Sequence, residues 1–349
     1  MRCCLFFRLL APLLACALLA ACESGPPDSA VRVTGSTMGT GYELKLVPKP
    51  GQSIAADSIK RQAEALLARV NRQMSTYDPD SELSRFNRNP STDWIAVSPE
   101  LLYVVAEGLR VGELTGGAFD ITVGPLVNLW GFGPDARRDQ VPSEDAIAAA
   151  RQRVGYWQLH ARAEPPALKK DRADLYVDLS ALAKGYGVDR LAELVEANGI
   201  HDYLVSIGGD LRAKGLNGKG QPWTVAIERP VPGQRAVERL IRISDHAVST
   251  AGDYRNFFEQ DGQRYSHIIN PRTGRPVPRT VVSVTVIGKL DLHADAADTA
   301  LMAAGADQGF QLATEHHLAA LFILADPDGK SFTERYTPEF EPFQVPEKP

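Results

Sequence analysis

Cysteine is confined to the first part of this 349-residue chain, and its absence elsewhere excludes a disulfide framework. The four cysteines are Cys3, Cys4, Cys16 and Cys22, and residues 23–349 contain none. Small secreted domains often depend on disulfides because their cores are small. This chain must instead be held together by an ordinary hydrophobic core, and it is long enough for one large domain or two small ones.

Several common functional signatures are also missing. No cluster of lysine and arginine occurs and the net charge is −5, so nucleic acid is not expected as a partner. The seven histidines have no zinc-ligand spacing, and no cysteine of the body could complete such a site. There is neither the Gly-x-Ser-x-Gly elbow of a serine hydrolase nor a Walker-type phosphate loop. Any chemistry must therefore come from other residue types.

The N-terminus has the pattern of a secretory signal followed by a lipidation site. Positive charges precede an apolar run at 9–21, which is shorter than the ~20 residues of a membrane-spanning helix. The run ends in Leu-Ala-Ala-Cys, which resembles a bacterial lipobox, where the cysteine is acylated and becomes the first residue of the mature protein. We therefore expect residues 1–21 to be a lipoprotein signal peptide and Cys22 to carry the lipid.

The two ends of the mature chain are expected to lie outside the folded body. Residues 22–31 are polar and rich in proline and glycine, which predicts a flexible tether. Residues 338–349 contain four prolines and predict an extended surface tail. The lipid would hold the protein on a bacterial membrane, facing the periplasm or the cell exterior. Glu23 rather than aspartate follows the lipidated cysteine, which favours the outer membrane of a double-membrane cell.

Residues 32–337 combine helical and strand-like patterns without regular alternation. Amphipathic helical periodicity occurs at 56–74, 98–109, 143–154 and 180–198. Strand-like runs bounded by glycine, proline or aspartate occur at 42–47, 204–207, 223–227, 240–243, 281–287 and 318–324. Because helices do not follow strands one for one, a doubly wound parallel sheet is not expected. The pattern predicts an α+β fold with mixed or antiparallel sheets flanked by helices.

Two glycine-rich segments indicate a ligand site. Residues 35–41 offer small side chains and backbone amides that could approach a ligand, although a plain loop has the same composition. Residues 115–126 contain a double glycine, Phe119 and Asp120. With Tyr77, Phe119 could form an aromatic slot for a flat ligand. The alternative is that both rings belong to the core, which is the commoner case for aromatic residues.

Two further segments indicate a phosphate and a metal ion. Lys184 lies where a strand end runs into a helix start, a place that favours anions, although a solvated lysine has the same position. Asp295, Asp298 and Thr299 share one face of an otherwise apolar helix. Carboxylate and hydroxyl oxygens suit Mg²⁺. The competing interpretation is a helix start at which aspartates interact with the helix dipole.

Taken together, these segments resemble the ApbE-type FAD:protein FMN transferase family over about 35–305. The motifs occur in family order: Gly-Ser-Thr-Met-Gly-Thr, Met-Ser-Thr-Tyr-Asp-Pro, Gly-Gly-Ala-Phe-Asp-Ile-Thr-Val-Gly-Pro, Asp-Leu-Ser-Ala-Leu-Ala-Lys-Gly-Tyr, Ser-Ile-Gly-Gly-Asp, Tyr-Ser-His-Ile-Ile-Asn-Pro-Arg-Thr-Gly and Ala-Asp-Ala-Ala-Asp-Thr-Ala. The resemblance implies an ApbE-like fold, with residues 32–337 as a flavin transferase domain that uses FAD and Mg²⁺.

The resemblance also assigns roles to individual residues. It places these residues against the flavin: Met38, Tyr77, Ala118, Phe119, Asp120, Ser180, Tyr186 and Ile269. It assigns the metal ion to the carbonyl of Ala183 and the side chains of Asp295, Asp298 and Thr299. Ala251 stands where the family usually has serine, so a hydrogen bond expected there is missing.

The implied reaction is Mg²⁺-dependent transfer of FMN from FAD to a threonine hydroxyl of another protein, with release of AMP. His267 is the candidate general base, because imidazole accepts a proton near neutral pH. Asp253 is the reserve candidate. The implied acceptors are flavin-bearing subunits of sodium-pumping quinone reductases or of Rnf-type complexes. Two alternatives remain, a pyrophosphatase that splits FAD into FMN and AMP, and a non-catalytic flavin-binding lipoprotein.

Overall fold

The computed structural model describes residues 30–134, 139–231, 233, 236–326 and 331–346. The predicted signal peptide, Cys22 and all but the end of the predicted tether lie outside these residues. Within the described ranges, no helix combines the length and the apolar character needed to span a membrane.

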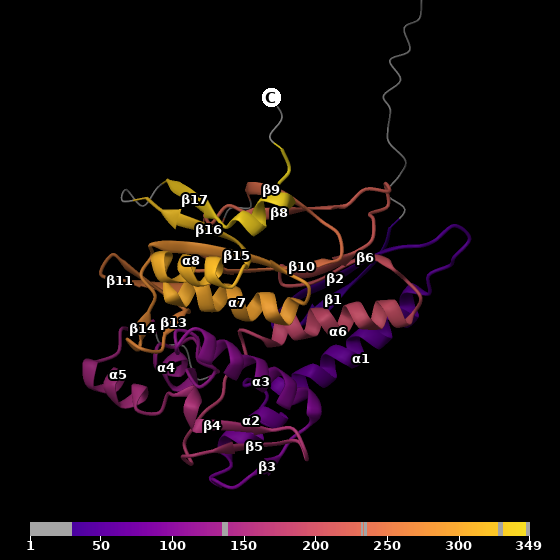
Figure 1. Cartoon of the computed structure of the whole chain (residues 1–349). Helices are drawn as coiled ribbons and strands as arrows, with labels where there is room; N and C mark the ends of the chain where they lie inside the picture. Colours follow the sequence, from indigo (N-terminus) through magenta and orange to yellow (C-terminus); the bar gives the residue numbers. More distant parts are fainter. Residues whose placement is uncertain (1–29, 135–138, 232, 234–235, 327–330, 347–349) are drawn as a thin grey trace, which may run out of the picture.

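An eight-stranded antiparallel sheet forms the centre of the molecule (Figure 1). Its spatial order is β1-β2-β6-β7-β10-β15-β16-β17. The strands are β1 (Val31–Thr37), β2 (Thr40–Val47), β6 (Asp202–Ile207), β7 (Asp210–Lys214), β10 (His246–Gly252), β15 (Val281–Gly288), β16 (Ala319–Ala325) and β17 (Phe332–Tyr336). The predicted α+β class with antiparallel sheets is confirmed.

Helices cover one face of this sheet and continue into a second layer below it (Figure 1). α1, α6, α7 and α8 lie against the sheet, whereas α2 to α5 lie farther from it. The helices are α1 (Ala56–Met74), α2 (Glu82–Arg88), α3 (Pro99–Leu114), α4 (Gly124–Leu129), α5 (Glu144–Arg151), α6 (Ala183–Ala197), α7 (Asp291–Ala304) and α8 (Ala306–Glu315).

Smaller ribbons complete the fold. Three of them are two-stranded, β8-β9, β11-β12 and β13-β14, and one has the order β3-β5-β4. Their bounds are β3 (Ile95–Ala96), β4 (Leu159–Arg162), β5 (Ala167–Lys170), β8 (Trp223–Glu228), β9 (Val237–Ile243), β11 (Phe257–Gln260), β12 (Gln263–Ser266), β13 (Ile269–Asn270) and β14 (Arg275–Pro276). Two short 3₁₀ helices are η1 (Tyr156–Gln158) and η2 (Pro338–Phe343).

The long helices form where the sequence pattern predicts them. α1 buries the predicted stripe, which ends at Met74. α3 begins after Ser98, whose hydroxyl accepts a hydrogen bond from the amide of Leu101 at 3.3 Å, and Pro99 occupies its first position. Apolar periodicity and caps of this kind depend only on local sequence, so they locate these helices without tertiary information.

Two segments differ from the sequence-based expectation. Residues 35–41 are a β-hairpin rather than a loop, since β1 and β2 are joined through Met38 (φ 48°) and Gly39 (φ 71°). Positive φ at both central residues is typical of the turn that matches strand twist. The predicted extended tail contains η2, and its Phe340 is fully buried in the core between the sheet and the β8-β9 ribbon. Burial of this aromatic ring outweighs the prolines around it.

The fold brings α6 and α7 close together beneath the centre of the sheet. α6 packs on β6 and β7, and α7 packs on β10 and β15. Gly185 makes the approach of the two helices possible, because a Cβ atom there would lie 2.5 Å from the carbonyl oxygen of Asp291 and 2.8 Å from Cβ of Asp295. The helix pair thereby brings the segment of Lys184 close to the segment of Asp295, Asp298 and Thr299.

Candidate active site

A cavity of about 450 Å³ lies between the sheet, the start of α6, the middle of α7 and the loop that follows α3. It gathers most of the residues predicted to form the site. The predicted residues that line it are Tyr77, Ala118, Phe119, Asp120, Ser180, His267, Ile269, Asp295, Asp298 and Thr299. Residues as far apart in the chain as Tyr77 and Thr299 therefore share one concave surface, as expected for a ligand site.

One side of the cavity is aromatic. Tyr77 follows α1 and is 66% exposed, and its hydroxyl donates a hydrogen bond to the carbonyl of Phe132 at 3.3 Å. Phe119 is buried, and its amide donates to the hydroxyl of Thr115 at 3.1 Å. An exposed tyrosine ring at a cavity has apolar area available for a ligand, whereas Phe119 also contributes to the core.

Asp120 is a structural support of this aromatic side. Its Oδ1 accepts hydrogen bonds from the amide and the hydroxyl of Thr122, both at 2.7 Å, and Oδ2 accepts from the amide of Tyr156 at 2.9 Å. Burial raises the pKa of Asp120, and these hydrogen bonds oppose the rise. The carboxylate thereby fixes the loop that carries Ala118 and Phe119.

The cavity is also lined by a charged group of residues, named the charged side below, which includes Lys184, Asp210 and Asp295. Lys184, in the first turn of α6, forms ion pairs with Asp210 at the start of β7 and with Asp295 on α7, the latter at 3.1 Å. Burial alone would lower the pKa of Lys184, but the two carboxylates raise it well above its usual value. Asp210 also accepts a hydrogen bond from Ser249 at 2.9 Å. Lys184 is therefore a fixed counter-charge rather than a solvated lysine.

The two predicted metal-binding aspartates have different surroundings. Asp295 accepts hydrogen bonds from Lys184 and, at 2.9 Å, from the amide of Gly185. Both carboxylate oxygens of Asp298 are buried without a hydrogen-bond partner of normal geometry. Burial raises the pKa of Asp298 well above its usual value, and Asp295 and Asp210 add to the rise. Lys184 and the nearby Ser249 hydroxyl oppose it.

His267 lies on the cavity wall next to Phe132. Its Nδ1 is 3.1 Å from the carbonyl oxygen of Asn256. A carbonyl only accepts hydrogen bonds, so Nδ1 carries the hydrogen and Nε2 keeps its lone pair. Burial lowers the pKa of His267 to about 4, although the bond to Asn256 opposes this. The ring is therefore neutral near pH 7 with the Nε2 lone pair free, and it is a weaker base than an ordinary imidazole.

Four predicted residues do not line the cavity. Met38, in the β1-β2 turn, and Tyr186, on α6, pack on the neighbouring hydrophobic core, and Tyr186 faces Tyr103 with the ring centroids 6.3 Å apart. Ala183 is the first residue of α6. Asp253 is buried 3.8 Å from Arg279, and burial raises its pKa to about 6.

Sequence reasoning missed a second charged pair at the cavity. Arg255 forms an ion pair with Glu228, and both residues line the cavity. Tyr254 donates a hydrogen bond to the same carboxylate at 3.2 Å. Glu228 ends β8 and Arg255 follows β10, so no local pattern relates them. Ala251, which departs from the family pattern, also lines the cavity.

The charged side fits a magnesium ion in its chemistry. The buried carboxylate oxygens of Asp298 are of the ligand type that Mg²⁺ prefers, and burying them without partners is costly. Asp295 and Thr299 lie on the same helix face. Among the described residues, no three His, Cys, Asp or Glu side chains converge as a complete ligand set. A site of two carboxylates, one hydroxyl and one carbonyl does not require such a set.

Comparison with known proteins identifies the family of this chain. The sequence model described as the ApbE family matches residues 38–322. A FAD:protein FMN transferase of Vibrio cholerae serotype O1 is 49% identical over 328 residues, which are 93% of this chain and 96% of that protein.

Solved structures give the same result. The flavin transferase ApbE from Vibrio cholerae has a TM-score of 0.83 and 46% identity, covering 91% of this chain and 100% of that chain. The apo form of the Pseudomonas stutzeri flavinyl transferase ApbE has a TM-score of 0.82 and 38% identity, covering 91% and 97%. The resemblance found in the sequence motifs is thereby confirmed. This chain belongs to the ApbE family.

Proposed function

We propose that this protein is a FAD:protein FMN transferase that depends on Mg²⁺ and attaches FMN to a threonine hydroxyl of an acceptor protein. Relatives with the transferase name match the chain over nearly its full length. The observation that carries the proposal is Asp298, whose two buried carboxylate oxygens lack partners on the wall of a cavity that also presents an exposed tyrosine ring.

The residues of the cavity divide into a flavin side and a phosphate side. Tyr77 and Phe119 offer ring faces to the isoalloxazine system, and stacking of this kind contributes about 0.5–1.5 kcal/mol beyond burial. Lys184, Asp295 and Asp298 lie at the other side. When bound by Asp295, Asp298, Thr299 and the carbonyl of Ala183, Mg²⁺ supplies charge neutralisation on the pyrophosphate of FAD.

His267 is the general base in this proposal. Its neutral ring, with Nε2 as the proton acceptor, removes the proton from the attacking threonine hydroxyl. A bond forms between the threonine oxygen and the phosphorus on the FMN side, and the bond from that phosphorus to the bridging oxygen breaks. AMP leaves with the electron pair. Asp253 is a weaker candidate, because it does not line the cavity.

One experiment separates this function from its two alternatives. The protein is incubated with FAD, Mg²⁺ and a purified flavin-bearing acceptor domain, and all products are weighed by mass spectrometry. A transferase gives acceptor-bound FMN and one AMP for each FMN attached. A FAD pyrophosphatase gives free FMN and AMP without modified acceptor, and a storage protein gives unchanged FAD. Omission of Mg²⁺ is the matched control.

The location and the partners belong to the same proposal. Acylation of Cys22 would tether the domain to a bacterial membrane on the periplasmic or external side, and the first residue after Cys22 favours the outer membrane. The proposed acceptors are subunits of quinone reductases or Rnf-type complexes. The intact mass of the membrane-extracted protein tests the lipid, and an unmodified mature chain would contradict it.

A further inference from the structure

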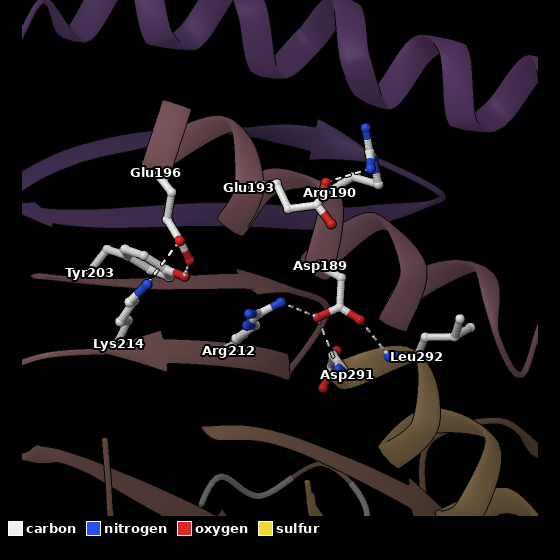
Figure 2. Close-up of polar contacts among 9 residues, drawn as sticks. All are labelled: Asp189, Arg190, Glu193, Glu196, Tyr203, Arg212, Lys214, Asp291 and Leu292. Carbon is white, nitrogen blue, oxygen red and sulfur yellow. Dashed lines mark hydrogen bonds and ion pairs between the residues drawn. The ribbon is translucent and has the colours of Figure 1, made fainter. Parts of the chain in front are cut away.

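Asp189 connects three elements that carry the charged side of the cavity. It lies on α6, is only 5% exposed and does not line the cavity. Its Oδ1 accepts hydrogen bonds from the amide of Asp291 and from Nη1 of Arg212, both at 3.0 Å. Its Oδ2 accepts from the amide of Leu292, also at 3.0 Å (Figure 2). One carboxylate thus joins α6, β7 and the start of α7.

The two amides that donate hydrogen bonds to Asp189 are the first two of α7. The first amides of a helix have no partner within the helix and need acceptors from elsewhere. The residue before α7 is Leu290, whose side chain cannot cap, so the cap comes from a different helix. A carboxylate at this position also interacts favourably with the helix dipole. The start of α7 is therefore fixed relative to α6.

Each joined element also carries a residue of the charged side. α6 carries Lys184, β7 begins with Asp210, and α7 carries Asp295 and Asp298. The contacts of Asp295 with Lys184 and Gly185 hold α7 at a second point, one helical turn beyond the cap. Two attachment points set both the rotation and the axial position of α7, and so the position of Asp298, which within the described ranges has no hydrogen-bond partner of normal geometry.

We propose that Asp189 is a positioning residue for the metal ligands of α7, and that the affinity of the site for a divalent cation depends on it. The proposal rests on the function proposed above. Partners behind the ligands of a metal site typically alter metal affinity by about 10–100-fold when they are removed. A loss of this size is expected when α7 can rotate or slide.

A neighbouring network provides a matched control. Near the end of α6, Glu196 accepts hydrogen bonds from the hydroxyl of Tyr203 at 2.6 Å and from Nζ of Lys214 at 2.8 Å (Figure 2). These contacts tie the same helix to β6 and β7, but they do not include α7. Tyr203→Phe therefore removes a buried hydrogen bond of α6 without releasing the metal ligands.

The test measures the binding of Mn²⁺ alone by electron paramagnetic resonance. It compares the wild-type protein with Asp189→Asn and Tyr203→Phe. Asn cannot accept both amides and also pair with Arg212, so Asp189→Asn should weaken Mn²⁺ binding by about 10–100-fold. Amide hydrogen exchange at 291 and 292 should accelerate. Tyr203→Phe should lower the melting temperature but leave Mn²⁺ affinity unchanged. If Asp189→Asn does not fold, Arg212→Lys replaces it in the test. This variant keeps the cap and the charge, so it should lose less Mn²⁺ affinity.

Each result has a distinct meaning. Equal Mn²⁺ affinity in wild type and Asp189→Asn would overturn the positioning role, and so would an equal loss of affinity in Tyr203→Phe. Absence of Mn²⁺ binding by the wild type would instead contradict the metal site proposed above. In that case the positioning role would be overturned together with the metal site, and faster amide exchange at 291 and 292 in Asp189→Asn would show only that Asp189 caps α7.

Discussion

The amide of Gly185 at the start of α6 donates a hydrogen bond of 2.9 Å to Oδ2 of Asp295 in the middle of α7. This contact requires glycine, because a side chain at 185 would collide with α7. It provides Asp295 with a protein partner, whereas Asp298, three residues farther along the same helix, has no partner of normal geometry among the described residues. The two aspartates are therefore unequal. Asp295 is held in place by hydrogen bonds from the protein, whereas in the proposed metal site Asp298 would offer its oxygens to the cation.

Replacement of Asp298 by Asn should separate stability from function. Without metal, the variant should be more stable, because the neutral amide removes the like-charge repulsion of Asp298 by Asp295 and Asp210. With Mg²⁺, FMN transfer should fall at least about 100-fold, because a charged ligand is lost. Thermal melting in EDTA and the transfer rate check the two effects. Asp307→Asn, at a fully exposed position on α8, is the control and should change neither. A less stable Asp298→Asn that still transfers FMN would contradict the metal assignment.

Tyr77 should contribute to FAD affinity through its ring rather than its hydroxyl. The hydroxyl makes one hydrogen bond, to the carbonyl of Phe132, and the ring is largely exposed. Tyr77→Ala should weaken FAD binding by about 2–10-fold, and Tyr77→Phe should bind nearly normally. Titration followed by flavin fluorescence measures both. Normal affinity of Tyr77→Ala would remove this residue from the flavin site.

His267 should make the fold sensitive to acid. Its pKa in the folded protein is about 4, below the ~6.5 of an unfolded histidine. The unfolded state therefore binds the proton first, and stability is lost as pH falls from about 6.5 to 4. His267→Gln should reduce this loss by at most ~3 kcal/mol, since the ring keeps some exposure to the cavity. Urea unfolding at pH 7 and pH 4.5 tests this, and equal pH dependence of the two proteins would contradict it.

The same variant should lose transfer while it still binds FAD. If His267→Gln transfers FMN at the wild-type rate, the general base must be another residue. Asp253, whose pKa of about 6 lies nearer to neutral pH than that of His267, would then be tested next by Asp253→Asn.

The fold was predictable where local sequence determines structure. The stripe of α1 and the Ser98 cap of α3 could be located because periodicity and caps need no tertiary information. β10 was not predicted, since His246–Gly252 lacks the bulky β-branched run of a typical strand and is stabilised by pairing with β7 and β15. Phe340 was placed in a surface tail for a related reason. Its burial depends on packing against β16 and β9, and β9 is far away in sequence.

The site was predictable to a similar degree. Motif resemblance indicated residues that line the cavity, including Tyr77, His267 and Asp298. It could not tell which side of α6 each residue occupies, so Tyr186 and Lys184, two positions apart, face different surroundings. The role of Asp189 has no local signal at all, because its cap on α7 exists only after the two helices have packed.

The most direct test of the account is the mass of an acceptor protein after incubation with this enzyme, FAD and Mg²⁺. The account predicts that the acceptor gains the mass of FMN less one water on a single threonine. One AMP should appear for each FMN attached. EDTA or Asp298→Asn should prevent both the mass gain and the release of AMP. Conversion of FAD into free FMN and AMP with an unmodified acceptor, or transfer that proceeds equally in EDTA, would contradict it.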